Sequence, residues 1–229
     1  MINLTKSYPV PECLAIEKNK PNGTYRCEEV YDLLKKDFHN KCYLCEEKGI
    51  TSINIEHFKP HKGNRELEFD WDNLFLSCFH CNNTKGDKYN DILNCLDKET
   101  KILNIIKFDI KPYPKEKAKI STNSKDLKVK NTVKLLNKIY NGTTFHKRLE
   151  SSNLRQKLIE ELVKFGRVLT EYFDDIVNDL EKEEYLKQIK KMLREDSPFC
   201  AFKVYIVLEN EFFMKEFKDF ISTSIIDLN

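Results

Sequence analysis

The sequence has no long apolar segment, and this absence limits the kind of protein it can encode. No apolar run in the 229 residues approaches the roughly 20 residues that a helix needs to cross a bilayer. The first residues also lack the basic start and apolar stretch of a signal peptide. We therefore expect a cytoplasmic protein with no membrane partner.

Two further absences bear on function and organisation. The ATP-binding motif GxxxxGK[ST] does not occur, so if ATP is used, another chain must supply its binding site. There is no internal repeat and no low-complexity tract, and 40% of the residues are hydrophobic. This length and composition predict one packed domain or two small ones.

Four of the eight cysteines form two CxxC pairs, Cys42 with Cys45 and Cys78 with Cys81. Zinc takes four tetrahedral ligands, and four cysteines are a common structural set. We therefore predict one structural Zn²⁺ held by both pairs. The pairs are further apart than in a compact zinc ribbon, so another element must fold between them.

Two other interpretations of the cysteines stay open. A single CxxC pair can be redox-active, although two pairs without a thioredoxin-like βαβ pattern favour a metal. A disulfide framework belongs to oxidising compartments, which a lysine- and glutamate-rich chain without a secretion signal does not suggest. Cys13 and Cys27 have no partner spacing, so we expect them to be small buried residues.

The stretch between the two pairs has the alternation of a β-strand. Apolar and polar residues alternate through Ile53–His57, and Pro60 ends the run because proline cannot donate to a ladder. Glu56 and His57 therefore lie at the end of a predicted strand. A purely structural zinc module has no need of this acidic and imidazole pair.

A second strand is predicted at residues 73–76, which include Asn73. From Cys81 the chain can turn into a short helix. Asn82 and Lys85 are three residues apart there and would share one face of that helix.

These pieces carry a resemblance to a known family. Cys-x-x-Cys, Glu-His-Phe-x-Pro, Asn-Leu and Cys-x-x-Cys-Asn-x-x-Lys follow one another between Cys42 and Lys85. In type and order they resemble an HNH endonuclease of the ββα-metal type. A broader likeness, beginning at residues 11–14, is similar to the HNH nuclease subunit of Septu-type antiphage systems (PtuB-like), some of which are retron-associated.

The resemblance implies a role for each of five residues. His57 matches the general base that deprotonates water, and Glu56 matches a ligand of the catalytic cation. Asn73 matches the residue that braces the loop and so orients the base, and Asn82 matches a second cation ligand. Lys85 would meet a phosphate. The sequence departs from the commoner pattern in having Glu rather than Asp before the first histidine and Asn82 in place of the last.

The resemblance also implies partners. They are nucleic acid, an ATPase subunit of the ABC/SMC type (PtuA-like) and, in retron-associated systems, a retron RNA/DNA component. The chemistry permits DNA or RNA because it does not need the 2′-hydroxyl group.

The same residues suit phosphodiester hydrolysis on chemical grounds. A neutral imidazole, with an ordinary pKa of about 6.5, is a suitable base near neutrality, and a divalent cation stabilises charge on phosphate. Carboxylate and amide oxygens favour Mg²⁺ or Mn²⁺. The structural alternatives are a purely structural His57, with its ring nitrogens hydrogen-bonded within the fold, and turn or capping roles for Asn73 and Asn82. We expect His61 and His80 to be surface residues.

Charge is divided unevenly, although the net charge is only +2. Residues 101–138 contain 11 lysines and three acidic residues, a balance of +8, which suits either a nucleic-acid backbone or a solvated face. Residues 171–196 contain nine acidic and five basic residues, a balance of −4. We do not expect that segment to face nucleic acid.

Helical periodicity dominates outside the motif. Helices are predicted at 13–18, 27–39, 89–99, 124–141, 151–180 and 183–193, with another starting at Ser197–Pro198 and one or two strands over 102–110. Ile176 is placed on the apolar stripe of the long helix.

We therefore predict an α+β, mostly helical protein. It has a small ββα-metal HNH core with a four-cysteine zinc knuckle, followed by a C-terminal helical region. Four segments are expected: an N-terminal arm with a lead-in helix (1–40), the nuclease core with its zinc site (41–98), a basic strand and loop connector (99–123) and the helical region (124–229).

Two other functions fit the sequence. One is a zinc-stabilised nucleic-acid-binding or scaffolding module without catalysis, which would have no need of Glu56, His57 and Asn82. The other is a stand-alone HNH restriction nuclease.

Overall fold

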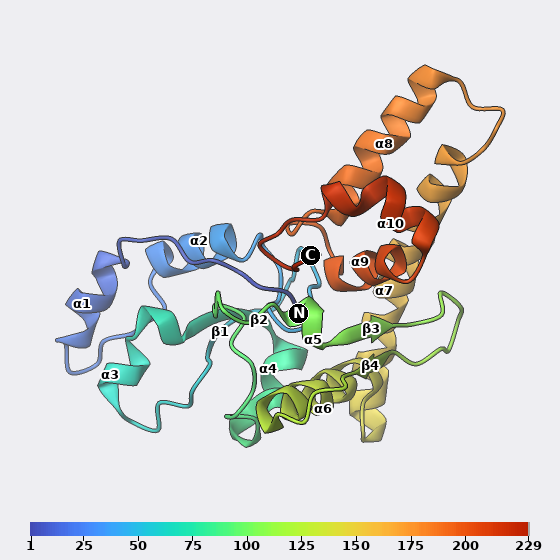
Figure 1. Ribbon diagram of the computed structural model, residues 1–229. Coiled ribbons are helices and arrows are strands. Elements are labelled where there is room, and N and C mark those ends of the chain that lie inside the picture. The colour runs from blue at the N-terminus through green and yellow to red at the C-terminus, as the bar shows by residue number, and fades with distance from the viewer. Residues whose placement is uncertain (229) are drawn as a thin grey trace.

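The computed structural model describes residues 1–228 and has two small antiparallel sheets among many helices (Figure 1). One sheet pairs β1 (Ile53–His57) with β2 (Leu74–Cys78), and the other pairs β3 (Lys107–Asp109) with β4 (Lys119–Ser121). The predicted α+β, mostly helical class is confirmed. Along residues 1–228, no helix has both the length and the apolar character that crossing a bilayer requires.

The β1–β2 hairpin and the helix after it form a ββα unit. Glu56 pairs with Phe75 across the hairpin, and His57 pairs with Leu74. Helix α4 (Phe79–Lys85) follows β2 directly and stops at Gly86, whose φ of +48° favours glycine. The loop between the strands carries the short helix α3 (Arg65–Glu68) and the 3₁₀ turn η1 (Trp71–Asn73). Both predicted strands and the short helix are therefore present.

The N-terminal segment forms α1 (Glu12–Lys18) and α2 (Glu28–Asp37), close to the two helices predicted there. A disulfide joins Cys13 to Cys27, so the expectation of two unpaired buried cysteines was wrong. Both residues are half-buried. The bond forms because the start of α1 folds back beside the start of α2, which no sequence spacing announces.

The helical region begins with α6 (Leu127–Asn141), which packs against α4 and α7. Helix α7 (Phe145–Tyr172) is the longest and pairs with α8 (Asp179–Leu193). Figure 1 shows these two helices projecting from the rest of the molecule as a hairpin. Helices α9 (Cys200–Leu208) and α10 (Glu211–Phe217), then the 3₁₀ turn η3 (Lys218–Phe220), complete the region.

Residues 89–99 do not form the predicted helix. Of the expected apolar face, Ile92 is buried and Leu93 and Leu96 are half-buried against the core, but backbone groups of this segment bond to distant partners. The Cys95 carbonyl accepts from the Leu4 amide at 2.8 Å, and the Leu93 amide donates to Thr132 Oγ1 at 2.8 Å. Tertiary bonds thus replace helical ones in this segment.

Three boundaries in the second half also differ from expectation. The apolar run at 102–110 starts as a short helix, α5 (Ile102–Ile105), before β3. Ser197 does not begin a helix, because its hydroxyl donates to the Met192 carbonyl at 2.7 Å and α9 starts after Phe199. Ile176 is 93% exposed, since α7 ends before it.

Candidate active site and zinc site

The four cysteines of the two CxxC pairs come together in one cluster. Their sulfurs lie within 4.8 Å of one another, and all four are buried and outside any disulfide. The Cys45 and Cys78 sulfurs are 3.9 Å apart, close to the roughly 3.8 Å that a tetrahedral site with Zn–S distances near 2.3 Å gives. The cluster therefore fits one tetrahedral zinc ion.

The C-terminal helices hold the first half of this cluster in place. The Tyr140 hydroxyl of α6 donates to the Cys45 carbonyl at 2.7 Å. The next residue, Glu46, is 2% exposed. Its carbonyl accepts from the Phe199 amide at 3.2 Å, and its carboxylate accepts from the Ala201 amide at 3.3 Å. The knuckle and the helical region are thus one packed unit.

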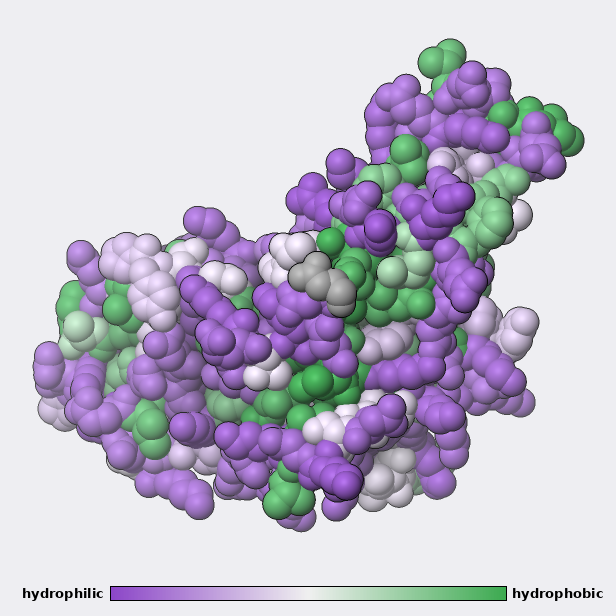
Figure 2. All heavy atoms as spheres, in the orientation of Figure 1, coloured by the Kyte–Doolittle hydropathy of each residue, from purple (hydrophilic) through white to green (hydrophobic). Residues whose placement is uncertain are grey.

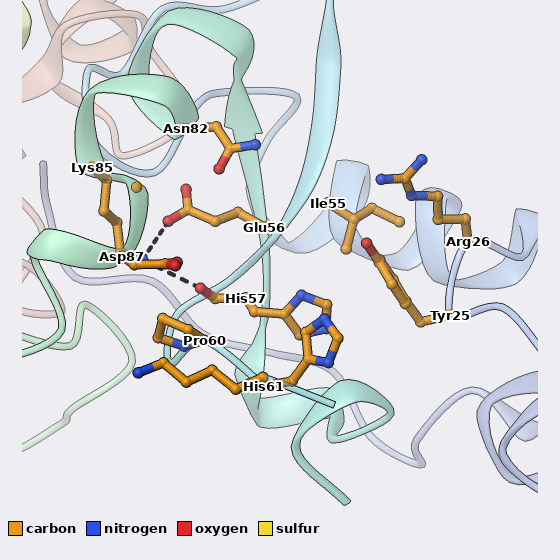
Figure 3. A pocket seen from close by; sticks show the side chains of 12 residues that line it. Tyr25, Arg26, Ile55, Glu56, His57, Pro60, His61, Asn82, Lys85 and Asp87 are labelled. Atoms are coloured by element: carbon orange, nitrogen blue, oxygen red, sulfur yellow. Dashed lines mark hydrogen bonds and ion pairs between the residues drawn. The ribbon is translucent and has the colours of Figure 1, made fainter. Parts of the chain in front are cut away.

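An open pocket of about 370 Å³ lies at the end of β1. Strand β1, helix α4, the loop after β1 and the segment before α2 all contribute side chains to it (Figure 3). The lining residues are Tyr25, Arg26, Ile55, Glu56, His57, Pro60, His61, Lys62, Asn82, Lys85, Gly86 and Asp87. Four of the five predicted catalytic residues are in this set, and Asn73 is not.

Glu56 is a buried carboxylate with one oxygen engaged and one free. Its Oε1 accepts from Lys85 Nζ at 2.7 Å and from the Tyr43 hydroxyl at 3.2 Å. Its Oε2 is buried without a hydrogen-bond partner among the described residues. Burial raises the pKa of Glu56, and the Lys85 ammonium opposes this effect.

His57 presents one ring nitrogen to the protein and leaves the other for chemistry. Its Nε2 lies 3.0 Å from the Glu68 carbonyl oxygen. Because a carbonyl oxygen only accepts, we assign the proton to Nε2, and Nδ1 remains a free base. Burial lowers the pKa of His57, which keeps the ring neutral at neutral pH.

Two aromatic rings hold the imidazole of His57. Tyr25 meets it edge-on with ring centroids 4.6 Å apart, and His61 lies against it at the same separation. Nothing in the sequence connects Tyr25 or Arg26 with this motif, because the chain brings them there only by folding. His61 lines the pocket and is not the plain surface residue that we expected.

Asn73 lies behind the pocket and fastens the loop that follows β1. Its Oδ1 accepts from the Lys59 amide at 2.7 Å. Its Nδ2 donates to the Lys59 carbonyl and the Leu67 carbonyl, each at 2.9 Å. The loop so fastened leads into Glu68, whose carbonyl contacts the ring of His57.

Asn82 and Lys85 project from α4 toward Glu56 (Figure 3). The amide of Asn82 and the orphan Oε2 of Glu56 are oxygen donors of the kind that Mg²⁺ or Mn²⁺ prefers, so the residues present fit such a cation. Lys85 is only 2% exposed, and its Nζ also donates to the His57 carbonyl at 3.2 Å. The Lys85 ammonium therefore neutralises the Glu56 carboxylate and is not exposed at the surface of the pocket.

His80, predicted to be a surface residue, is a bridge between three helices. Its Nδ1 lies 2.6 Å from a carboxylate oxygen of Glu150 in α7. Its Nε2 lies 2.8 Å from the Ile139 carbonyl in α6. Both ring nitrogens are therefore engaged within the fold.

The comparisons with known proteins agree with this geometry. Residues 42–88 match the family model of the HNH endonuclease, so this segment is an HNH endonuclease domain. Septu protein PtuB from Bacillus mycoides (strain KBAB4) is 37% identical over 89 residues, which is 32% of this chain and 30% of that protein. The chain thus spans under a third of the relative that it matches. No solved structure matches the chain.

Proposed function

We propose that this protein is a metal-dependent HNH endonuclease that hydrolyses phosphodiester bonds in DNA or RNA. The observation that carries the proposal is one juxtaposition in the pocket. The free Oε2 of the buried Glu56 and the unengaged Nδ1 of His57 belong to adjacent residues, both of which line the same polar pocket. Glu56 Oε2 can bind a cation, and His57 Nδ1 can accept a proton.

Each residue has one task in the proposed mechanism. His57 Nδ1 takes a proton from the attacking water, and the Glu68 carbonyl stabilises the resulting imidazolium through Nε2. Asn73 keeps the loop, and hence the imidazole, in position. Glu56 and Asn82 would hold Mg²⁺ or Mn²⁺. The bound cation supplies stabilisation of the negative charge that builds on the phosphate and the leaving oxygen.

The four-cysteine cluster has a structural task in this proposal. Zn²⁺ bound by Cys42, Cys45, Cys78 and Cys81 leaves no open coordination position for a substrate or water. It fixes the knuckle beside β2, where the Tyr43 amide donates to the Leu76 carbonyl at 3.1 Å. Zinc thereby sets the frame on which the catalytic strand β1 rests.

We further propose a role as the nuclease subunit of an antiphage defence complex. The similarity to Septu protein PtuB supports this role and an ATPase of the ABC/SMC type (PtuA-like) as partner. A retron RNA/DNA component would belong to retron-associated forms. The lack of a GxxxxGK[ST] motif is consistent with ATP being bound by the partner.

The test compares the purified wild type with His57→Ala. Plasmid DNA and total RNA are offered separately with Mg²⁺ or Mn²⁺, with and without the product of the neighbouring gene. We expect cleavage by the wild type only, with equal zinc content in both proteins. A His146→Ala variant, altered at an exposed histidine of α7, is the matched control and should cleave normally.

The pH profile of the same reaction checks the base. A lowered pKa for His57 means that cleavage should fall only below about pH 6.5, the ordinary value for histidine. Zinc-loaded protein that captures nucleic acid but never cleaves it would instead support a binding or scaffolding module.

A further inference from the structure

We propose that the arm formed by residues 12–27 completes the active site, with Arg26 binding a substrate phosphate and Tyr25 positioning His57. The inference rests on the proposed nuclease function and extends it to a segment outside the HNH domain of residues 42–88. The sequence assigned the phosphate contact to Lys85, which the structure buries against Glu56. A phosphate entering the pocket would then meet another cation, and Arg26 and Lys62 are the exposed cations in its lining.

Arg26 is well placed to be that cation. It is exposed and lines the same pocket as His57 and Asn82. Within residues 1–228 its guanidinium makes no ion pair and no hydrogen bond, and it lies 5.4 Å from the ring centroid of Tyr25. Figure 3 shows both side chains on the same side of the pocket. A planar guanidinium with five donors matches the oxygens of a phosphodiester.

The arm is fastened to the HNH domain by Arg65, the first residue of α3. The guanidinium of Arg65 donates to the carbonyls of Lys18 at 2.6 Å, Lys20 at 3.0 Å and Glu17 at 3.3 Å. Lys18 also pairs with Glu66 of the same helix. These three hydrogen bonds and one ion pair fix the position of the arm on α3.

Two features within the arm also fix its conformation. A Cβ added at Gly23 would lie 1.8 Å from the Glu17 carbonyl oxygen, so only glycine allows this close approach. The Cys13–Cys27 disulfide closes the loop immediately after Arg26. Sequence and cross-link together fix the point at which Tyr25 and Arg26 enter the pocket.

Helix α3 connects the arm to the catalytic base. Arg65 at its start holds the arm, and the Glu68 carbonyl at its end contacts His57 Nε2 at 3.0 Å. The ring of Tyr25 also contacts the imidazole, edge-on at an interplanar angle of 76°. The arm and α3 thus both contact the imidazole of His57, which makes Tyr25 a positioning residue.

The Arg26 test uses Arg26→Ala, Arg26→Lys and, as matched control, Arg167→Ala on an exposed arginine of α7. Losing a charged hydrogen-bonding contact should lower kcat/KM by about 10- to 100-fold. In a His57→Ala background, the slope of log affinity against log salt should become shallower by about 0.7–0.9. Arg26→Lys should recover part of both effects, and Arg167→Ala should match the wild type.

The Tyr25 test separates positioning from folding. Tyr25→Ala should lower kcat several-fold with KM unchanged, and Tyr25→Phe, which keeps the ring, should restore kcat. Zinc content and the thermal midpoint are measured for every variant. A wild-type protein that cleaves, with Arg26→Ala equal to it in kcat/KM and salt slope, overturns the Arg26 proposal. Equal kcat for Tyr25→Ala overturns the Tyr25 proposal, whereas a wild type without cleavage overturns the nuclease function itself.

Discussion

Glu56 and Lys85 form a buried ion pair at the floor of the pocket, with side chains 4% and 2% exposed and 2.7 Å between their charged atoms. Removing one partner from a buried pair usually costs about 3–5 kcal/mol, because the other charge stays without compensation. Here a divalent cation at Glu56 would supply the missing compensation. The pair therefore offers a measure of cation binding that does not depend on cleavage.

We predict that Lys85→Met lowers the free energy of unfolding by about 3–5 kcal/mol without divalent cations, and that Mg²⁺ restores part of the loss. Only the folded state binds the cation tightly, so binding stabilises it. Without Lys85 the pKa of Glu56 rises further, so the loss should grow as pH increases. Chemical denaturation with and without Mg²⁺ measures both effects.

Lys88→Met, at an exposed lysine just after α4, is the matched control for that experiment. It should leave unfolding unchanged. No stabilisation of Lys85→Met by Mg²⁺ would contradict a cation site at Glu56.

At the scale of single residues, the sequence motif predicted the site residues that belong to the motif itself. Glu56, His57 and Asn82 line one pocket, as the pattern implied. The residues that contact them could not be predicted from the motif. Tyr25 touches His57 because Arg65 holds the arm beside the pocket, and Lys85 pairs with the buried Glu56. Neither contact can be predicted from local sequence spacing.

At the scale of elements, alternation predicted β1, and the second strand and short helix expected after it are present as β2 and α4. The same reasoning failed at residues 89–99. There Ile92 is buried and Leu93 and Leu96 are half-buried, but backbone groups form hydrogen bonds with other segments, such as that of the Leu93 amide with Thr132. Where the backbone of a segment forms hydrogen bonds with residues far away in the sequence, apolar periodicity indicates which side chains are buried but does not indicate a helix.

Cys78 joins two elements and is the position for a test of the knuckle. Its sulfur belongs to the cysteine cluster and accepts from the Cys81 amide at 3.4 Å, at the start of α4. We predict that Cys78→Ser loses zinc and unfolds the nuclease core, because structural zinc contributes folding energy directly. Zinc content per chain and thermal unfolding measure the outcome.

Cys95→Ser is the control, since Cys95 is equally buried but lies outside the cluster. It should keep its zinc and remain folded. A Cys78→Ser protein with normal zinc content and a native melting profile would contradict the four-cysteine assignment.

At the scale of the whole molecule, charge and apolar surface are distributed unequally. The α7–α8 hairpin ends in a segment rich in acidic residues, and Figure 2 shows hydrophobic atoms at the end of this projection. Ile176 is 93% exposed and Leu180 is 80% exposed. The unequal charge was predictable from the sequence, whereas the projection depends on how α7 and α8 pair.

We predict that an Ile176→Ser, Leu180→Ser double variant keeps its stability within about 0.5 kcal/mol, as surface changes usually do, yet no longer co-purifies with the product of the neighbouring gene. An exposed apolar tip surrounded by acidic residues suits a protein partner better than nucleic acid. Pull-down and thermal melting measure the two properties. Undiminished co-purification would place the contact elsewhere.

The attachment of the arm to α3 has a consequence for protein engineering. A chimera that transplants only residues 42–88 into another scaffold would carry Arg65 with no carbonyls to bind and His57 without the ring of Tyr25. The smallest portable cassette for the proposed activity therefore includes residues 12–27 and the C-terminal helices that pack on the knuckle, together with the HNH segment. Grafts that respect this larger unit should preserve turnover, and grafts cut at the edge of the motif should not.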